Sequence, residues 1–359
     1  MQKTTARHSY SRPSRNRDGL HLWPFRGQPP SRIQPTAVEA PHRSRPKVPY
    51  DQDRSPPSLR PVGKLAGPRE VQPMKAAIVG VGAMGRAMAG HIARAGHDVI
   101  AHDVSPERLE EAAADGLATA ATLEEAAERS EVLIVVVVTD AQSAAVTEGI
   151  VKAGRPGSTI VIAATNHPQT MQVLAGEAEA RGFRFVDAPV CFGLQGAREG
   201  RLVSLCGGAT ENVERIRPVL SAYSREVYHV GPVGTGQLAK TCNNMLHWAA
   251  CVANYEVLLL AKRYGIDAQR MREILLDCPG QNGTLRDWDS TRFTWHQKDM
   301  DVALDLAQEG AVPLPLFGQV DQLVKRLGPD RVKELLYGPE ASYLGAPVAP
   351  LKKDEGGLA

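Results

Sequence analysis

The chain has 359 residues, of which 43% are hydrophobic, so it is long enough for two domains and has the composition of a folded protein. No apolar run approaches the roughly 18 residues of a membrane-spanning helix, so we expect no membrane association. The first 73 residues carry 14 basic and 5 acidic side chains, and the rest carry 28 and 35. The remainder is therefore mildly acidic, which argues against nucleic acid as a partner.

Residues 1–73 hold 13 of the 26 prolines and show no hydrophobic periodicity, so we predict a disordered Pro/Arg-rich tail. Three interpretations stay open. Translation could start at Met74, which the composition favours. The segment could be a transit peptide, since its first 50 residues hold only Asp18 and Glu39 as acids, and the protein would then enter the mitochondrial matrix instead of the cytoplasm. It could also be a basic tail that contacts an acidic partner.

A glycine-rich motif follows the first predicted strand. The apolar run 76–79 leads into Gly80-x-Gly82-x-x-Gly85, a helical pattern follows, and a second apolar run ends at Asp103. This order indicates a dinucleotide-binding βαβ unit, in which the glycines allow a tight turn, the approach of a pyrophosphate and close packing of the helix. We predict that the cofactor contacts Gly80, Gly82, Ala83, Met84, Gly85 and Asp103.

Asp103 also bears on the choice of cofactor. A carboxylate at the end of the second strand accepts hydrogen bonds from ribose hydroxyls and repels the extra phosphate of NADP. No arginine follows before Arg108, so the sequence favours NAD over NADP. Alternatively, Asp103 merely caps the next helix, whose Ser105-Pro106-Glu107 opening is typical of an N-cap followed by proline at the first helical position.

Residues 74–233 alternate between strand and helix patterns. Helices are predicted at 83–95, 106–114 and 122–129. Strands are predicted at 75–80, 98–103, 132–138, 158–163, 183–187, 202–207 and 226–230. Such alternation predicts an α/β fold, a Rossmann-type doubly wound and mostly parallel sheet with helices on both faces.

The pattern changes at residue 234. Residues 237–264 form one long helical pattern without Pro or Gly, and further helical patterns follow at 267–277, 299–309 and 313–326. We therefore predict an all-helical domain over 234–340 for substrate binding and dimerisation. Residues 341–359 show no periodicity and are predicted to be a flexible tail. A cleft at the junction of the two domains is the expected ligand site.

Two segments stand out near this junction. Residues 186–209 are rich in glycine and small side chains, so their backbone N–H groups could bind a carboxylate, or they could form a structural turn. Lys240 and Asn244 lie one helical turn apart on one face. A lysine held in a cleft is suited to proton transfer, although a lone helical lysine is usually a solvated surface charge.

Four motifs in this order resemble the β-hydroxyacid dehydrogenases, the family that includes 3-hydroxyisobutyrate dehydrogenase and tartronate semialdehyde reductase. They are GVGAMGRAMAGHIARAGHDV, DAPVCFGLQGAREGRL, GTGQLAKTCNN and Lys298-Asp299-Met300. Together they span residues 74 to about 330. The resemblance implies a Rossmann-type domain, a helical domain and a homodimer or homotetramer.

The resemblance also implies roles for single residues. Lys240 matches the catalytic lysine and Asn244 the asparagine one turn later. Thr165 matches a position that contacts both nicotinamide and substrate, and Lys298 matches a lysine that reaches the cofactor. Val138 and Thr139 end a strand whose loop lies beside the cofactor in the family. The substrate site is expected at Thr165, Cys191, Phe192, Gly193, Lys240 and Asn244.

The chain departs from the family where the substrate motif usually reads Ser-Gly-Gly. Cys191 is a weaker hydrogen-bond partner than serine, and Phe192 adds bulk where backbone approaches the substrate carboxylate. The substrate is therefore expected to bind differently or to differ. Arg286 is a candidate for meeting a second carboxylate.

We expect an NAD-dependent enzyme that interconverts a small β-hydroxy acid and its semialdehyde or keto acid, with Lys240 as general acid and base. Two alternatives are an imine reductase-like enzyme and a non-catalytic NAD(P)-binding interaction protein, but both usually lack the lysine. The five cysteines show no metal-ligand spacing, so we expect free thiols, a reducing compartment and no metal.

Overall fold

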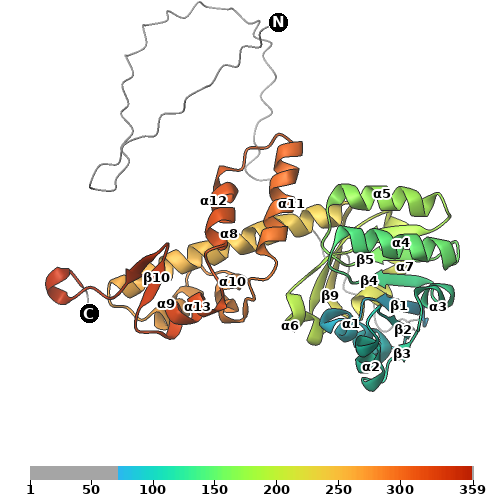
Figure 1. The fold of residues 1–359 in the computed structure, drawn as a ribbon, viewed down its shortest axis with the longest axis horizontal. Coiled ribbons are helices and arrows are strands. Elements are labelled where there is room, and N and C mark those ends of the chain that lie inside the picture. Colours follow the sequence, from blue (N-terminus) through green and yellow to red (C-terminus); the bar gives the residue numbers. More distant parts are fainter. Residues whose placement is uncertain (1–71, 358–359) are drawn as a thin grey trace, which may run out of the picture. The chain divides into compact units, whose positions relative to one another are not determined.

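The computed structural model describes residues 72–357, so nearly all of the segment 1–73 lies outside the described residues. The first part folds around a nine-stranded sheet in the order β3-β2-β1-β4-β5-β6-β8-β7, with β9 beside β8 (Figure 1). The strands are β1 Lys75–Val79, β2 Asp98–His102, β3 Ala118–Thr119, β4 Val132–Val135, β5 Thr159–Ile162, β6 Arg184–Asp187, β7 Val190–Cys191, β8 Leu202–Gly207 and β9 Ser224–Gly231. All pairs are parallel except those of β8 with β6 and β7.

Helices cover both faces of this sheet, because its central strands are apolar on both sides. Ile78 and Ile134 belong to one buried cluster, whereas Ala77 and Leu133 belong to another. The first cluster is covered by α1 Ala83–Arg94, α2 Pro106–Ala114 and α7 Thr210–Ser221. The second is covered by α3 Leu123–Arg129, α4 Asp140–Ala153 and α5 Pro168–Glu179. The predicted fold class is therefore confirmed (Figure 1).

The strand predicted over 132–138 is shorter than expected. β4 ends at Val135, which pairs with Val79 on β1 and Ile162 on β5, the last residues of those strands. Beyond this point neither neighbour continues as a strand, so Val138 has no ladder partner and its side chain is 45% exposed. β3 and β7 were not predicted, since two residues are too few to produce an alternating pattern.

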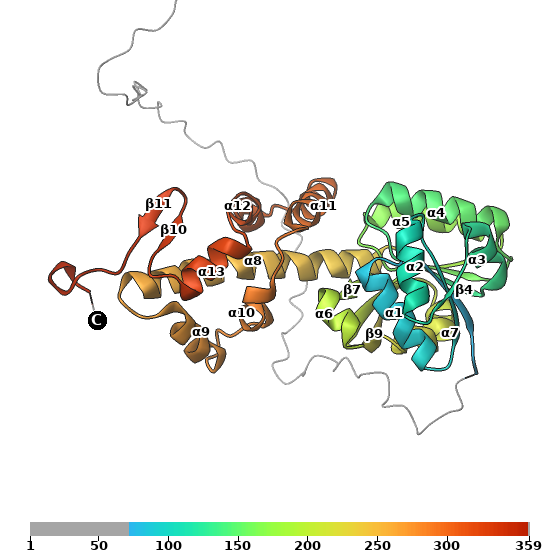
Figure 2. The same ribbon diagram turned by 60° about the horizontal axis from the view of Figure 1, so that its bottom comes forward.

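The second part is helical and is built along one long helix, α8 Thr235–Arg263 (Figure 2). The other helices are α9 Ala268–Leu276, α10 Gly283–Arg286, α11 His296–Glu309, α12 Pro315–Val324 and α13 Pro329–Tyr337. Each of them contacts α8, and a core that includes Trp248, Tyr255 and Trp288 lies between them. Within residues 72–357, none of these helices is long and apolar enough to cross a membrane.

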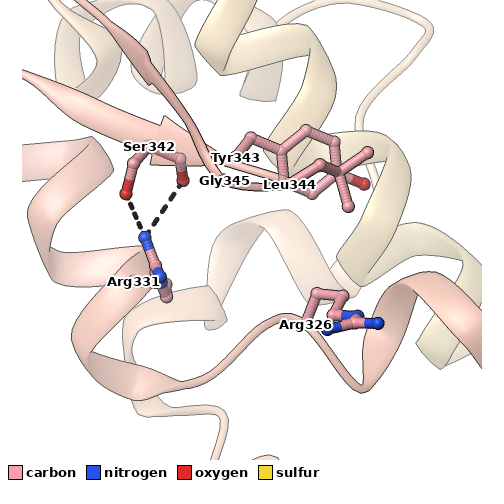
Figure 3. Close-up of a pocket in the computed structure, with 6 residues that line it drawn as sticks. All are labelled: Arg326, Arg331, Ser342, Tyr343, Leu344 and Gly345. Carbon is pink, nitrogen blue, oxygen red and sulfur yellow. Dashed lines mark hydrogen bonds between the residues drawn. The ribbon is translucent and has the colours of Figure 1, made fainter. Parts of the chain in front are cut away.

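The prediction of a tail without regular structure from residue 341 is wrong for its first part. β10 Ala341–Tyr343 and β11 Ala346–Val348 form an antiparallel hairpin. Distant residues hold it, because the Tyr255 hydroxyl donates to the Ser342 carbonyl at 2.8 Å and Arg331 donates to the carbonyl and hydroxyl of Ser342. Figure 3 shows these last bonds beside a hollow of about 440 Å³ that the hairpin lines.

Candidate active site

The glycine-rich motif forms the turn between β1 and α1. A Cβ at Gly80 would collide with the Val136 carbonyl, and one at Gly85 would collide with the Gly80 carbonyl, so the fold itself requires both glycines. Gly82 differs, because a Cβ there would meet nothing within 4 Å. The space in front of Gly82 and the N-terminus of α1, where Ala83 and Met84 begin the helix, is therefore open and fits a pyrophosphate.

Asp103 lies at the end of β2 and fixes this turn. Its carboxylate accepts hydrogen bonds from the Val81 N–H at 2.9 Å and from the Ser105 N–H at 3.0 Å. Asp103 is 5% exposed, and the exposed guanidinium of Arg108 lies 3.4 Å from Oδ2. The N-cap of α2 is Ser105 and not Asp103, so the interpretation of Asp103 as the cap of this helix is wrong. The carboxylate thus shapes the turn, and its contact with a ribose stays a prediction.

The carboxyl ends of β4 and β5 carry the next group of predicted residues. Lys298 of α11 donates from Nζ to the carbonyl oxygens of Val138 and Thr165, each at 2.5 Å. Desolvation lowers the pKa of Lys298, while the charges of Asp140 and Asp299 oppose that shift. Val138, Thr165 and Lys298 therefore lie together, and α11 is tied to the edge of the sheet where cofactors bind in such folds. The adjacent Thr139 caps α4.

Lys240 and Asn244 lie on the first turns of α8. The Lys240 ammonium is 3.9 Å from the Cys191 thiol, at the end of β7. Asn244 is buried, and its side-chain oxygen accepts a hydrogen bond from the Asn243 amide at 3.2 Å. The structure thus brings the predicted catalytic lysine to the first residue of the Cys-Phe-Gly segment.

Three further residues near Lys240 were not predicted. Asp299 accepts a hydrogen bond from the Trp248 indole at 2.9 Å, and burial raises its pKa, against which the Trp248 bond and the Lys240 charge act. His247 lies 2.9 Å from the Thr284 hydroxyl, and burial, aided by Lys240, lowers its pKa to about 4. His247 is therefore uncharged at neutral pH. The spacing of 247 and 248 from Lys240 places them on the same helical face, which the sequence could have indicated.

The N-terminus of α8 is anchored by buried polar groups. The Asp187 carboxylate, at the end of β6, accepts hydrogen bonds from the Gly234 N–H at 2.7 Å and the Gln237 N–H at 2.9 Å. The Gln237 side chain donates to the Ala164 carbonyl at 2.8 Å and accepts from the Asn166 N–H at 2.9 Å. These bonds fix the start of the helix that carries Lys240 against the ends of β5 and β6.

The departure from Ser-Gly-Gly has a structural consequence. Phe192 adopts a left-handed conformation with φ of 82°, immediately before α6 Gly193–Arg198. Its ring is 53% exposed and lies against Arg225, whose guanidinium carbon is 4.4 Å from the ring centre. Arg286 is exposed and donates to Gln281 at 3.1 Å, so its proposed contact with a substrate carboxylate stays a prediction.

Comparisons with known proteins agree with this geometry. Residues 75–231 match the NAD binding domain of 6-phosphogluconate dehydrogenase, and residues 234–334 match the NAD-binding domain of NADP-dependent 3-hydroxyisobutyrate dehydrogenase. A 3-hydroxyisobutyrate dehydrogenase of Pseudomonas aeruginosa is 33% identical over 58% of this chain and 71% of its own. A 2-(hydroxymethyl)glutarate dehydrogenase of Eubacterium barkeri is 28% identical over 70% of this chain and 88% of its own.

Among solved structures, 3-hydroxyisobutyrate dehydrogenase of Mycobacterium tuberculosis with L-serine is similar, with a TM-score of 0.66 and 26% identity. The match covers 70% of this chain and 93% of that one. Both the sheet and the helical part of the chain therefore have counterparts in known dehydrogenases.

Two of the glycines are expected to serve different purposes, Gly82 the binding of NAD and Gly85 the folding of the chain. Gly82→Ala should leave the free energy of unfolding of the NAD-free protein nearly unchanged but weaken NAD binding at least tenfold, because only the bound phosphates would meet the new methyl group. Gly85→Ala should lower the free energy of unfolding by roughly 2 kcal/mol or more through overpacking. Urea unfolding and NAD titration of both variants would check this, and equal effects on folding would contradict it.

The buried Asp187 carboxyl should give the protein a characteristic pH dependence. Burial raises its pKa from 3.8 to about 6, so this group makes folding less favourable as the pH rises from about 4 to about 6. Asp187→Asn does not titrate, so the difference in free energy of unfolding between wild type and variant should change by about 3 kcal/mol over that window. Urea unfolding between pH 4 and 7 measures it. The exposed Asp98→Asn is the control, and parallel curves for all three proteins would disprove the shift.

Proposed function

The chain belongs to the β-hydroxyacid dehydrogenase family and is an NAD-binding oxidoreductase, and we propose that it interconverts a small β-hydroxy acid and its semialdehyde or keto acid. The observation that carries this proposal is the position of Lys240. It stands on the anchored first turns of α8, next to Cys191, with Asn244 one turn away. Lys298 from the same helical part reaches the strand ends beside the cofactor turn.

In the proposed reaction Lys240 acts as general acid and base. When bound, NAD supplies the nicotinamide ring that takes a hydride from the substrate carbon. Lys240 in its neutral form removes the hydroxyl proton during oxidation and returns it during reduction. Asn244 hydrogen-bonds the substrate and so restricts the orientation of the bound substrate. Thr165 lies beside Lys298, at the place where the cofactor and substrate would meet.

The charges around Lys240 suit a proton that moves in both directions. Asp299 interacts favourably with the positive charge of Lys240 once the lysine has taken up the proton. His247 is uncharged at neutral pH, so it does not repel the ammonium. The indole N–H of Trp248 donates a hydrogen bond to Asp299 and so holds this carboxylate in place. These groups favour reversible proton transfer at one position.

NAD is the proposed cofactor, with NADP bound less well. The buried Asp103 carboxylate would lie close to the adenosine ribose and would repel a phosphate there. Arg108 is the one cation next to that carboxylate among the described ion pairs, and it is already paired with it. In this proposal the repulsion between the Asp103 carboxylate and a ribose phosphate therefore exceeds the attraction of that phosphate to the paired Arg108 guanidinium.

The substrate class is proposed as small hydroxy acids, with mono- and dicarboxylates both considered. The relatives include enzymes named for 3-hydroxyisobutyrate, which has one carboxylate, and for 2-(hydroxymethyl)glutarate, which has two. Cys191 and Phe192 alter the segment expected to bind a carboxylate. Arg286 on α10 is the proposed cation for a second carboxylate. Its helix contacts α8, the helix that carries Lys240, through the bond between Thr284 and His247.

A homodimer or homotetramer is proposed as the working form. One face of α8 carries three large apolar side chains that are 50% to 69% exposed, those of Leu246, Val257 and Leu260. Val257 lies three turns after Leu246, and Leu260 lies one turn after Val257. A row of large apolar side chains on a long helix is typical of a surface that another chain covers.

The catalytic proposal is tested with Lys240→Ala. Turnover of 3-hydroxyisobutyrate, 3-hydroxypropionate, L-serine, glycerate and hydroxy dicarboxylates with NAD would be compared in wild type, in this variant and in Lys333→Ala, an exposed lysine of α13. We expect kcat to fall by roughly 10²–10⁴-fold in Lys240→Ala only, with the Kd for NAD nearly unchanged. Turnover within tenfold of wild type would refute Lys240 as the general base.

The assembly is tested by light scattering of the purified protein, whose chain mass is 38.7 kDa. Wild type should have at least twice this mass, and Leu246→Glu with Leu260→Glu should lower it to that of one chain, because two charges would enter the interface. Val173→Glu, an equally exposed apolar position on α5, should leave the mass unchanged. A single-chain mass for wild type would rule the proposal out.

A further inference from the structure

A cluster of positive charge lies at the edge of the sheet opposite to the glycine-rich turn between β1 and α1. A hollow of about 480 Å³ opens where β1, β4, β5 and β6 begin, whereas the glycine-rich turn and Lys298 lie where strands end. One acidic residue, Glu131, lines it together with five basic residues. These are Lys75, Arg129, Arg155, Arg184 and Arg215. The excess is unusual in this chain, whose residues after 73 hold more acidic than basic side chains.

Few of these positive charges are neutralised within the described residues. Glu131 pairs with Arg215 at 3.3 Å, and its other oxygen accepts the backbone N–H of Lys75 at 3.1 Å. Arg129 pairs with Glu125 at 3.0 Å. Arg184 donates to the Gly157 carbonyl, which carries no net charge. The charged groups of Lys75 and Arg155 make no hydrogen bond or ion pair within residues 72–357.

Helix geometry explains only part of this cluster. Arg129 ends α3 and Arg155 follows α4, so both are favourable near the carbonyl ends of those helices. Lys75 and Arg184 instead begin strands, and Arg215 lies in the middle of α7. No helix terminus accounts for these three positions, and of the three only Arg215 has a carboxylate partner among the described residues.

The lining of the hollow also holds an unused hydroxyl group. Ser130 is 4% exposed, and its hydroxyl has no hydrogen-bond partner among the described residues. Buried polar groups are nearly always hydrogen-bonded, so this hydroxyl adds an unsatisfied polar group next to the hollow. The described lining contains no aromatic side chain, so it offers no surface on which a nucleobase could stack.

We propose that this hollow binds a small polyphosphate anion, such as a pyrophosphate or triphosphate group. Four guanidinium groups from four different elements surround it, and each forms paired hydrogen bonds with phosphate oxygens more readily than a lysine does. The cations come from five places in the fold, namely β1, α3, the α4–β5 turn, β6 and α7. An anion with two or three linked phosphates carries enough charge and enough oxygen atoms to engage several of them at once. The site is independent of the dehydrogenase reaction proposed above.

The probe is inorganic tripolyphosphate, titrated calorimetrically into the full-length protein saturated with NAD, at ionic strength held constant with sodium chloride. Saturation with NAD keeps the probe away from the N-terminus of α1. The variant is Arg155→Glu, whose side chain is exposed and has no described partner to lose. The control is Arg270→Glu, an equally exposed arginine of α9 with the same change of charge.

We expect saturable binding to wild type and to Arg270→Glu, and at least a tenfold weaker affinity in Arg155→Glu, as for the loss of one charge-assisted hydrogen bond. Turnover with NAD should be the same in all three proteins. Equal affinity in Arg155→Glu, or no saturable binding at constant ionic strength, would overturn the proposal. ATP, titrated as a second arm, should bind no more tightly than tripolyphosphate, because a nucleobase has nothing to stack on.

Discussion

The way in which α8 leaves the sheet is the constraint on which the proposed site depends. This helix has 29 residues and carries Lys240 close to its first turn, so a small tilt at its start would move the ammonium group. The first N–H groups of any helix have no partner within the helix, and here the Asp187 carboxylate accepts two of them from the α8 start. The positive end of the helix dipole favours a carboxylate at this place. Burial nevertheless raises the pKa of Asp187, so the anchor is held at a cost in folding free energy.

A second attachment restricts the same part of the molecule. Lys298 comes from α11 and donates to two carbonyl groups at the ends of β4 and β5. Asn166, at the end of β5, bonds to Gln237 of α8 and to Asp140 of α4. Hydrogen bonds from Asn166 and His167 outweigh burial and lower the pKa of Asp140, so its charge is available to Lys298. Two helices of the helical part are thus held at one edge of the sheet by buried polar groups, which rigidify a site only when they are satisfied together.

Much of the fold was predictable because it is encoded by local spacing. The turn from Gly80 to Asp103, the apolar central strands and the absence of Pro or Gly from 237–264 each produce a pattern that one short window contains. Errors arose where distant residues decide. β4 stops at Val135 because its neighbours stop, and the hairpin after residue 341 exists because Tyr255 and Arg331 bind it.

The same distinction applies to the site. Lys240 and Asn244 could be proposed from helical spacing and resemblance, although no measurement yet tests their roles. Asp187 and Gln237 lay inside recognised motifs, but no role was proposed for them because their bonds join positions 47 and 73 residues apart. Asp299 lay inside a recognised motif, but its bond to Trp248 joins positions 51 residues apart. Spacing within one helix is therefore readable from the sequence, whereas contacts between elements are not.

The cofactor end and the substrate end of the proposed site differ in how strictly the fold determines which side chains can stand there. At the cofactor end the chain's own atoms fill the space beside Gly80 and Gly85, so few other residues are possible. At the substrate end, Phe192 adopts a left-handed conformation that costs a bulky residue roughly 1–2 kcal/mol. Its contact with Arg225 is of the cation–π type, worth about 0.5–1 kcal/mol at an exposed position, and offsets part of that cost. The unfavourable conformation falls directly after Cys191, whose thiol lies 3.9 Å from the Lys240 ammonium group. The departure from the usual Ser-Gly-Gly therefore coincides with the strained position of this segment.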